Sequence, residues 1–323
     1  MKAVVVHGPK DLRVDEVEDP IPGEGEVVVG MEWGGLCGSD LSYWRNGASG
    51  TAVLVHPLIL GHEVAGRIIE VGSGVRDLAV GTAVTIHPAT SRGGYFGSAA
   101  LNPHTDGGFS GKRAVAAHQI RVLPEGLDTR RAALAEPLAV AMRAVSRPGS
   151  VLGRDILVNG AGPIGALVVA AARHAGAATI AVADVNPAAL AVAAAVGADE
   201  TIDLSAGHAL PADVELIFEA SGAPGALGAV LHAVARGGTL VQVGNLPGTP
   251  VPAVLGDLVT REVNWLGSYR FEDEITAAVA AMADGLDVEP LITHTFGIDD
   301  AVQAFETAAD RTSGSSKVLL DLR

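Results

Sequence analysis

The chain has 323 residues, of which 48% are hydrophobic and 18% charged, and its formal net charge is −15. This length favours two domains, and the composition is that of a globular protein rather than a disordered one. A strongly acidic chain is unsuited to nucleic acid or an anionic membrane, because phosphate binding requires clustered Lys and Arg. We therefore expect neither as a partner.

Cysteine usage and the N-terminal segment bear on the compartment. Cys37 is the single cysteine, so no internal disulfide can form and a reducing compartment fits. The apolar run within residues 1–10 is too short for a signal peptide, and long uncharged stretches such as 237–256 are interrupted by Gly, Pro, Gln and Asn. The sequence predicts a soluble, cytoplasmic protein.

The pattern of predicted elements changes near residue 130. Residues 1–125 are rich in Gly and Pro, and short alternating runs such as Glu26–Val29 and His118–Leu123 predict strands joined by turns. Beyond them, Ala-rich helical stretches alternate with strands that are apolar on both faces, which indicates an α/β fold with a parallel sheet covered on both sides. The helices are expected at 131–147, 163–176, 187–196, 224–235 and 272–285, and the strands at Asp155–Asn159, Thr179–Asp184, Glu215–Glu219, Gly238–Gly244 and Asn264–Tyr269. Residues 290–323 again predict strand, helix and strand.

A glycine-rich loop follows the first of these α/β strands. Gly160, Gly162 and Gly165 form a GxGxxG motif that contains Pro163 and Ile164 and opens a helix. In this context the glycines allow a tight turn, the approach of a pyrophosphate, and close packing of helix on strand. The helix N-terminus supplies unpaired N–H groups. The loop predicts a dinucleotide site, against the alternative of a plain glycine-rich turn.

The residues after the loop indicate which dinucleotide binds. The second strand ends at Asp184, whose carboxylate can accept hydrogen bonds from the adenosine ribose and would repel a 2′-phosphate. No Arg or Lys occurs between Asp184 and Gly197. We therefore predict NAD rather than NADP, and we expect Val243, Gly244 and Ser268 among the cofactor contacts.

Four residues could hold a metal ion. Cys37 lies in GGLCGSD, His62 and Glu63 are adjacent in LGHEV, and Glu136 lies in LAEPL. Each alone has an ordinary interpretation: a buried thiol, a turn histidine, a solvated carboxylate. Thiolate, imidazole and carboxylate are also the ligand types that zinc accepts, and an incomplete protein shell leaves a position for water or substrate. Beside a nicotinamide site, we interpret the four together as a zinc centre.

These motifs, in this order, resemble the zinc-dependent medium-chain dehydrogenases over nearly the whole chain. The polyol and sugar-acid branch, with its sorbitol and L-idonate 5-dehydrogenase families, is most similar, and the stretches 96–109 and 267–271 resemble the idonate enzymes. The resemblance implies a GroES-like β-rich catalytic domain (1–149 and 270–323) and a doubly wound Rossmann domain that binds NAD (150–269). The motifs that carry it are Cys37-Gly38-Ser39-Asp40, Gly61-His62-Glu63, Glu136-Pro137-Leu138 and the glycine loop.

The resemblance also implies roles for individual residues. Cys37, His62 and Glu63 would hold one catalytic zinc, and Glu136 would be either a further ligand or the residue that binds water on the zinc. Tyr43, Glu136 and Arg270 match substrate-contacting positions. Arg270 could pair with a carboxylate or donate to hydroxyls. Relatives are dimers or tetramers, so a homodimer or homotetramer is expected, with the strand near 264–269 as a candidate for pairing.

Two departures from the family pattern stand out. Most relatives carry four closely spaced cysteines that hold a second, structural zinc, whereas residues 86–96 contain no cysteine. We expect that lobe and its zinc to be missing, and residues 90–94 to form a surface loop. Ser42 stands where relatives commonly have a histidine that passes a proton to solvent, which leaves Ser39 as the first member of the proton route.

The predicted reaction is oxidation of a secondary alcohol of a polyol or sugar acid by NAD, and its reverse. Zinc lowers the pKa of the substrate hydroxyl, Ser39 accepts its proton, and the nicotinamide receives the hydride. Two alternatives belong to other classes. A zinc-free quinone or enoyl reductase would not need Cys37, His62 and Glu63 together, and a non-catalytic NAD(H)-binding protein is not favoured by any lost ligand.

Overall fold

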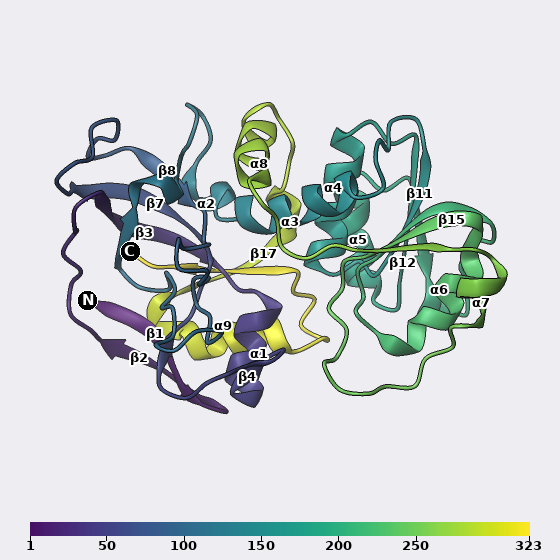
Figure 1. Cartoon of the computed structure of the whole chain (residues 1–323), viewed down its shortest axis with the longest axis horizontal. Helices are drawn as coiled ribbons and strands as arrows, with labels where there is room; N and C mark the ends of the chain where they lie inside the picture. The colour runs from purple at the N-terminus through teal and green to yellow at the C-terminus, as the bar shows by residue number, and fades with distance from the viewer. The chain divides into compact units, whose positions relative to one another are not determined.

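The computed structural model describes residues 1–323, and the chain divides into two compact units (Figure 1). The first unit contains Met1–Glu136 and Ile292–Arg323, and the second contains Pro137–Leu291. The expected boundaries at 149/150 and 269/270 differ from this division. Within the second unit, Arg143 on α3 (Ala135–Ser146) pairs with Glu272 and with Glu274, the first residue of α8 (Glu274–Ala283). The assignment of catalytic and cofactor roles to residue ranges remains a prediction.

The first unit is built mainly from strands. A seven-stranded sheet has the order β10-β8-β7-β3-β18-β17, with β9 also paired to β3, and a three-stranded sheet has the order β2-β1-β6. The C-terminal strand β18 therefore lies beside β3, near the start of the chain. The strands are β1 (Lys2–Gly8), β2 (Asp11–Glu16), β3 (Glu26–Gly35), β4 (Ala48–Ser49), β5 (Ala52–Val53), β6 (Leu58–Ile59), β7 (Glu63–Val71), β8 (Ala83–Ile86), β9 (Lys112–Ala116), β10 (Ile120–Val122), β17 (Ile292–Gly297) and β18 (Lys317–Asp321).

Alternating apolar residues on these strands form the core of the first unit. Val27, Val29 and Met31 of β3 are buried with Phe109 and with Phe305 of α9 (Ala301–Ala309). The other helices of this unit are α1 (Gly38–Asn46) and α2 (Thr129–Ala132). The prediction of strand, helix and strand near the C-terminus is confirmed by β17, α9 and β18.

The second unit contains a six-stranded parallel sheet. Its order, β13-β12-β11-β14-β15-β16, is that of a doubly wound Rossmann fold, in which the strand order reverses between β11 and β14. Helices α4 and α5 lie on one side of the sheet, and α6 and α7 lie on the other (Figure 1). The strands are β11 (Asp155–Asn159), β12 (Thr179–Asp184), β13 (Glu200–Asp203), β14 (Val214–Glu219), β15 (Val234–Gln242) and β16 (Asn264–Gly267), and the helices are α4 (Pro163–His174), α5 (Pro187–Ala195), α6 (Leu227–Ala233) and α7 (Gly256–Thr260).

The α/β fold class is confirmed, and several predicted elements differ from the observed ones. The predicted strand His118–Leu123 is a 3-10 turn (Ala117–Gln119) followed by β10, and the strand predicted at Gly238–Gly244 is β15, which begins at Val234. The strand β13 was not predicted, because its segment ETID contributes one buried side chain, Ile202, and lacks an apolar run. The predicted helix 131–147 is divided into α2 and α3. The predicted helix 224–235 ends at Ala233, because Val234 already pairs with Val214 at the start of β15.

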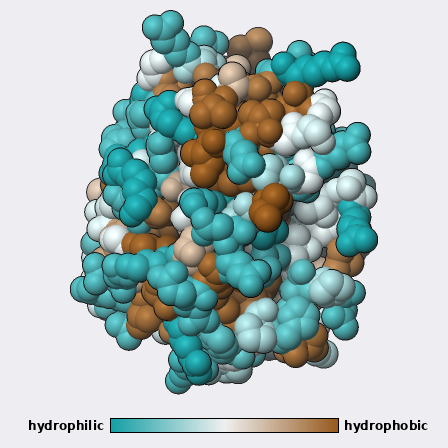
Figure 2. Space-filling view, turned by 90° about the vertical axis from the view of Figure 1, so that its left-hand side faces the viewer, coloured by the Kyte–Doolittle hydropathy of each residue, from teal (hydrophilic) through white to brown (hydrophobic).

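The surface of the molecule carries both polar and apolar residues. Figure 2 shows one face of the molecule, which is mostly hydrophilic with apolar residues gathered in its upper half. Apolar atoms on a surface are normal for a folded protein. None of the helices is long and apolar enough to cross a membrane.

Candidate metal and cofactor sites

Cys37 lies at the amino end of helix α1. It is the N-cap residue, and its backbone N–H donates to Oδ2 of Asp40 at 2.9 Å. This places the half-buried sulfur at the positive end of the helix dipole, where an anionic ligand atom is stabilised. The local sequence CGSD thus forms the helix start and positions the thiol.

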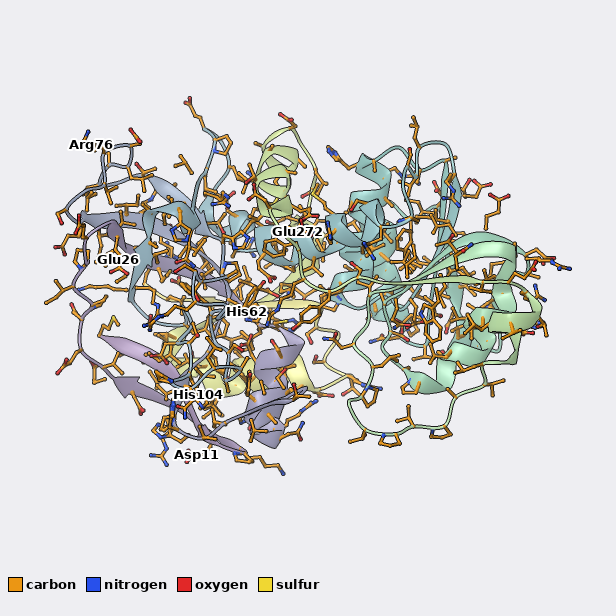
Figure 3. The ribbon with its side chains drawn as sticks, in the orientation of Figure 1. Asp11, Glu26, His62, Arg76, His104 and Glu272 are labelled. Carbon is orange, nitrogen blue, oxygen red and sulfur yellow. The ribbon has the colours of Figure 1, made fainter.

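His62 and Glu63 follow a glycine turn that leads into β7. Gly61 has φ +98°, and a Cβ there would lie 2.2 Å from the Phe109 ring, so only glycine fits. Glu63 is the first residue of β7 and His62 precedes the strand, so the alternation of strand side chains does not separate the two. His62 lies inside the first unit, whereas Asp11 and Arg76 lie near its edges (Figure 3).

The fold brings three of the four predicted metal ligands together. One ligand atom each from Cys37, His62 and Glu63 lies within 4.8 Å of the other two. Zinc bonds of about 2.0–2.3 Å in a tetrahedral site need only a small contraction of this cluster. Glu136 is not a member of it. The sulfur, nitrogen and oxygen donors fit a zinc ion with an open position.

Asp40 connects the two ligand-bearing segments. Besides the Cys37 N–H, its carboxylate accepts a hydrogen bond from the Gly61 N–H at 3.3 Å, and Oδ1 lies 3.8 Å from Nδ1 of His62. Burial raises the pKa of Asp40. Burial by itself would lower the pKa of His62, but Asp40, Cys37 and Glu136 together outweigh this effect and raise the pKa well above its usual value. Asp40 faces Nδ1, which leaves Nε2 of His62 for a metal.

Glu63 is fully buried and is paired with a lysine from the other end of the chain. Nζ of Lys317 lies 2.8 Å from both carboxylate oxygens. Burial raises the pKa of Glu63 to about 7, although Lys317 opposes this shift. Burial by itself would lower the pKa of Lys317, but Glu63, together with Cys37 and Glu136, more than offsets this effect and the pKa is raised. The sequence analysis did not identify Lys317.

Glu136 is also buried and has a tyrosine partner. The Tyr95 hydroxyl donates to Oε1 of Glu136 at 2.5 Å, and the Tyr95 ring centroid lies 5.7 Å from that of His62. Tyr95 directly follows a turn in which the Thr90 N–H donates to the Gly94 carbonyl and the Gly94 N–H donates to Oγ1 of Thr90. Residues 90–94 thus form the short loop that the sequence predicted.

The structure restrains two further side chains on α1. The hydroxyl oxygen of Tyr43 accepts a hydrogen bond from the Ala99 N–H at 2.9 Å. The Ser42 hydroxyl donates to the Ala48 carbonyl at 2.7 Å. Ser39 is half-buried in the first turn of α1, two residues after Cys37.

The glycine loop has the geometry that a dinucleotide requires. Gly160 turns the chain with φ +98°, and a Cβ on Gly165 would lie 1.8 Å from the Gly160 carbonyl oxygen, so helix and strand pack closely. A Cβ on Gly162 would meet no atom within 4 Å. Packing of the protein therefore does not require a glycine at 162, whereas the approach of a pyrophosphate does. Pro163 and Ile164 begin α4 directly after this open position.

The other predicted cofactor residues lie at the carboxyl ends of neighbouring strands. Asp184 ends β12, and its carboxylate accepts hydrogen bonds from the Ala161 N–H at 2.6 Å and the Asn186 N–H at 2.8 Å. Val243 and Gly244 follow β15, and Ser268 follows β16 with a buried hydroxyl that has no hydrogen-bond partner. In open α/β sheets this edge is where ligands bind.

Glu219 is a residue of this edge that the sequence analysis missed. Its buried carboxylate accepts hydrogen bonds from Asn159 Nδ2 at 2.5 Å, from the N–H groups of Ser221 and Gly222, and from the Ser221 hydroxyl. Its carbonyl oxygen accepts from the N–H of Gly244 at 2.8 Å. Glu219 therefore ties together the ends of β11, β14 and β15. Burial raises its pKa.

Arg270 lies in the second unit with an unusual backbone. Its φ is +52°, a left-handed conformation that is costly for a residue with a side chain, and its guanidinium lies 5.1 Å from the Tyr269 ring centroid. Such strain is found preferentially at functional positions. The role of Arg270 in substrate binding remains a proposal.

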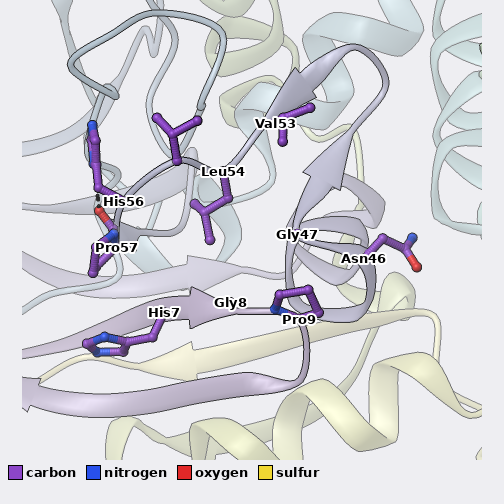
Figure 4. Close-up of a pocket in the computed structure, with 10 residues that line it drawn as sticks. His7, Gly8, Pro9, Asn46, Gly47, Val53, Leu54, His56 and Pro57 are labelled. Atoms are coloured by element: carbon purple, nitrogen blue, oxygen red, sulfur yellow. Dashed lines mark hydrogen bonds between the residues drawn. The ribbon is translucent and has the colours of Figure 1, made fainter.

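A separate surface cavity of about 420 Å³ lies in the first unit (Figure 4). His7, Pro9, Asn46, Val53 and His56 contribute to its wall. It shares no lining residue with the candidate metal ligands. We therefore assign it no part in the chemistry of this site.

Fold and donor set together define a class: a zinc-dependent dehydrogenase with a nicotinamide cofactor. Sequence comparison places the chain within it. The family model for "Alcohol dehydrogenase GroES-like domain" matches residues 23–125, and that for "Zinc-binding dehydrogenase" matches residues 163–284. The chain belongs to the zinc-dependent medium-chain dehydrogenase superfamily, and its first unit carries the GroES-like domain.

Similar proteins cover nearly the whole chain. Sorbitol dehydrogenase of Bos taurus is 36% identical over 95% of this chain and 92% of its own length. L-idonate 5-dehydrogenase (NAD(P)(+)) of Escherichia coli K-12 is 33% identical over 99% of this chain and 98% of its own length. A crystal structure of that enzyme, covering 99% of this chain and 97% of its own, has a TM-score of 0.91. A zinc-binding dehydrogenase of Sinorhizobium meliloti, bound to NADP, is 30% identical with a TM-score of 0.88, and covers 99% of this chain and 98% of its own.

Proposed function

We propose that this protein is a zinc- and NAD-dependent dehydrogenase that interconverts a secondary alcohol and a ketone on a polyol or sugar acid. The observation that carries the proposal is the group of Cys37, His62 and Glu63, which offers three different zinc-ligand types from two segments of a dehydrogenase fold. A zinc-free reductase would have no use for this donor set. A non-catalytic NAD(H)-binding protein would not need it either.

The chain's own residues would bind and orient the reacting groups. Cys37, His62 through Nε2, and Glu63 would hold the zinc, which when bound supplies a Lewis acid that acidifies the substrate hydroxyl. Ser39, half-buried and two residues from Cys37, would accept the proton of that hydroxyl and pass it on. Glu136 is fixed by Tyr95, and we propose that it acts through hydrogen bonds rather than as a protein ligand.

Three features support NAD as the cofactor. Gly162 leaves open space at the amino end of α4, where N–H groups can bind a pyrophosphate. Asp184 is fixed beside this loop by two backbone N–H groups, and each oxygen keeps a lone pair for a ribose hydroxyl. A 2′-phosphate would meet a fixed carboxylate. The Sinorhizobium relative shows that NADP can be bound within this superfamily, so the cofactor preference must be measured.

The substrate class rests on the residues that the family resemblance predicts to contact the substrate. Tyr43, Glu136 and Arg270 all offer polar groups, and leaving such a group unpaired costs about 1–3 kcal/mol. Two unpaired groups would reject a simple apolar alcohol by about a hundredfold or more. The relatives named for sorbitol and L-idonate support a polyhydroxylated substrate.

We also propose that the chain forms a homodimer or homotetramer. Strand β16 is the edge of the parallel sheet, and a free edge can pair with a second copy. Val254 and Val259, on the segment before this strand, are 75% and 78% exposed. Measurement of the molar mass in solution tests this proposal.

Two measurements on the purified enzyme test the function. Metal analysis should find about one zinc per chain, since the chain lacks the cysteines of a structural site. A screen of NAD⁺ reduction should then find activity with L-idonate or sorbitol and little with 2-butanol. Absence of zinc would support the reductase or non-catalytic alternatives, and two zincs per chain would contradict the single-site assignment.

A further inference from the structure

Lys317 makes its contacts next to two of the proposed zinc ligands. It is one of four lysines in the chain and the one that is buried. Its ammonium donates to both oxygens of Glu63, at 2.8 Å each, and to the Leu36 carbonyl at 3.0 Å, directly before Cys37. All three ammonium protons are therefore used within the metal site.

The surrounding backbone confines this ion pair. The Leu36 N–H donates to the carbonyl of Val318, so β18 is held beside the Cys37 segment at the residue after Lys317. On the other side, a Cβ on Gly35 would lie 2.3 Å from Oε2 of Glu63. The Glu63 carboxylate thus lies between the Gly35 backbone and the ammonium, and it cannot turn toward water.

The energetic consequence depends on whether a metal is present. A buried carboxylate with no cation beside it is strongly unfavourable, so Lys317 stabilises the metal-free chain. When Glu63 also binds a zinc ion, two cations share one carboxylate and repel each other through a poorly screening interior. The same contact that supports the metal-free chain therefore opposes the metal.

We propose that Lys317 is a positioning residue that competes with zinc for Glu63: it is the counter-ion of this carboxylate in the metal-free protein and sets the zinc affinity below what Cys37, His62 and Glu63 alone would give. The inference rests on the proposed zinc site. It concerns the strength of metal binding, which the identity of the ligands leaves open.

The test uses the metal-free full-length chain and zinc ion itself. Lys317→Met keeps an unbranched apolar stem and removes the charge. We expect the melting temperature of the metal-free variant to fall by about 5 °C or more. Its zinc dissociation constant, measured against a chromophoric chelator, should decrease by about tenfold or more, and zinc should raise its melting temperature more than it does for the wild type.

Control variants separate this role from a general effect on folding. Lys2→Met removes a lysine from an exposed ion pair with Asp299 in the same unit and should change neither quantity. Lys317→Arg keeps the charge and should keep zinc affinity near that of the wild type. The double variant Glu63→Gln with Lys317→Met should recover stability of the metal-free chain while binding zinc weakly.

Four results would contradict the proposed competition between Lys317 and zinc or the zinc site on which it rests. If Lys317→Met lowers the stability of the metal-free and zinc-bound forms equally, or leaves zinc affinity unchanged or weaker, Lys317 does not compete with the metal. A variant that stays unfolded in excess zinc also overturns the inference, because zinc should replace the missing cation. If the wild type itself binds no zinc, the proposed site is wrong, and that failure is distinguishable from the others.

Discussion

The Tyr95 hydroxyl donates a 2.5 Å hydrogen bond to Oε1 of Glu136, although 41 residues separate the two in the chain. Both side chains are buried, and the Tyr95 ring also lies beside the His62 ring. A buried carboxylate held by a phenol cannot reorient freely. We infer that Tyr95 fixes the orientation in which Glu136 faces the reaction.

Tyr95→Phe should therefore impair catalysis more than folding. Removing a hydrogen bond to a charged group costs about 1.5–3 kcal/mol, so kcat should fall by about tenfold or more while KM for NAD is unchanged. Steady-state kinetics measure this. In a double-mutant cycle with Glu136→Gln, the two losses should not add, because the partners act as a pair. Fully additive losses would show that Tyr95 acts independently of Glu136.

Cys37→Ser and His62→Ala should each lose zinc and activity while still folding and binding NADH. A site that lacks one ligand should lose roughly a hundredfold or more in metal affinity, whereas the glycine loop belongs to the other unit. Metal analysis and NADH fluorescence titration measure the two properties. Ser42→Ala, which alters a hydroxyl bonded to the Ala48 carbonyl, is the control and should keep its zinc. A Cys37 or His62 variant with full zinc and turnover would falsify the assigned site.

Asp184→Ala combined with Val185→Arg should shift preference from NAD toward NADP. The change removes a carboxylate that would repel a 2′-phosphate and adds a cation at a position that is 63% exposed. The ratio of kcat/KM for NADP to that for NAD should rise by about tenfold or more. Asp184→Ala alone is the control, and it should lower kcat/KM for NAD without a comparable increase in kcat/KM for NADP. An unchanged ratio in the double variant would place Asp184 away from the ribose.

Arg270→Ala should distinguish a sugar acid from a neutral polyol. If the guanidinium pairs with a substrate carboxylate, kcat/KM for L-idonate should fall by about 10- to 100-fold and that for sorbitol should fall less. Arginine and alanine at position 270 must both adopt φ near +52°. Any backbone effect of the substitution should therefore lower kcat/KM equally for the two substrates. Equal losses on both substrates would mean that Arg270 does not bind a carboxylate.

Glu219→Gln should remove a loss of stability that the wild-type chain undergoes as the pH rises. Burial raises the pKa of Glu219 in the folded chain above its usual 4.5. The folded state then holds this proton more tightly than the unfolded state does. The contribution of this proton to the free energy of unfolding is fully present below pH 4.5, and it is lost as the pH rises through the pKa of Glu219 in the folded chain. A glutamine does not titrate, so the melting temperature of the variant relative to the wild type should rise between pH 4.5 and 8. A difference that is constant with pH would contradict this.

Glu219→Gln also tests whether the cofactor binds at the carboxyl ends of the parallel strands. Glu219 ties Asn159, Ser221 and Gly222 beside the glycine loop, and a glutamine amide cannot accept hydrogen bonds through its nitrogen. We expect NADH to bind about tenfold more weakly, as measured by fluorescence titration, while the zinc content stays unchanged. Thr260→Val, which alters an exposed hydroxyl on α7 of the same unit, is the matched control.

Local sequence patterns by themselves determined a large part of this protein. The bounds of β11 and β12 were predicted correctly, because buried parallel strands are continuous apolar runs between turn residues. Short motifs also predicted the GxGxxG loop, the acid at the end of the second strand, and the three candidate zinc ligands that the fold brings together. Such motifs can be recognised in a sequence because their chemistry depends on residues that are neighbours in the chain.

The tertiary structure alone decided which distant residues share a site. Lys317 lies 254 residues after Glu63, and nothing in its local sequence marks it as buried; it reaches Glu63 because β18 pairs with β3, and β3 with β7. Tyr95 lies in a loop and Glu136 on helix α3, and tertiary packing likewise brings these two distant residues together. Periodicity reports which face of an element is buried, but it carries no information about the element on the other side. The cation that pairs with Glu63 is therefore determined by the order of strands in the sheet.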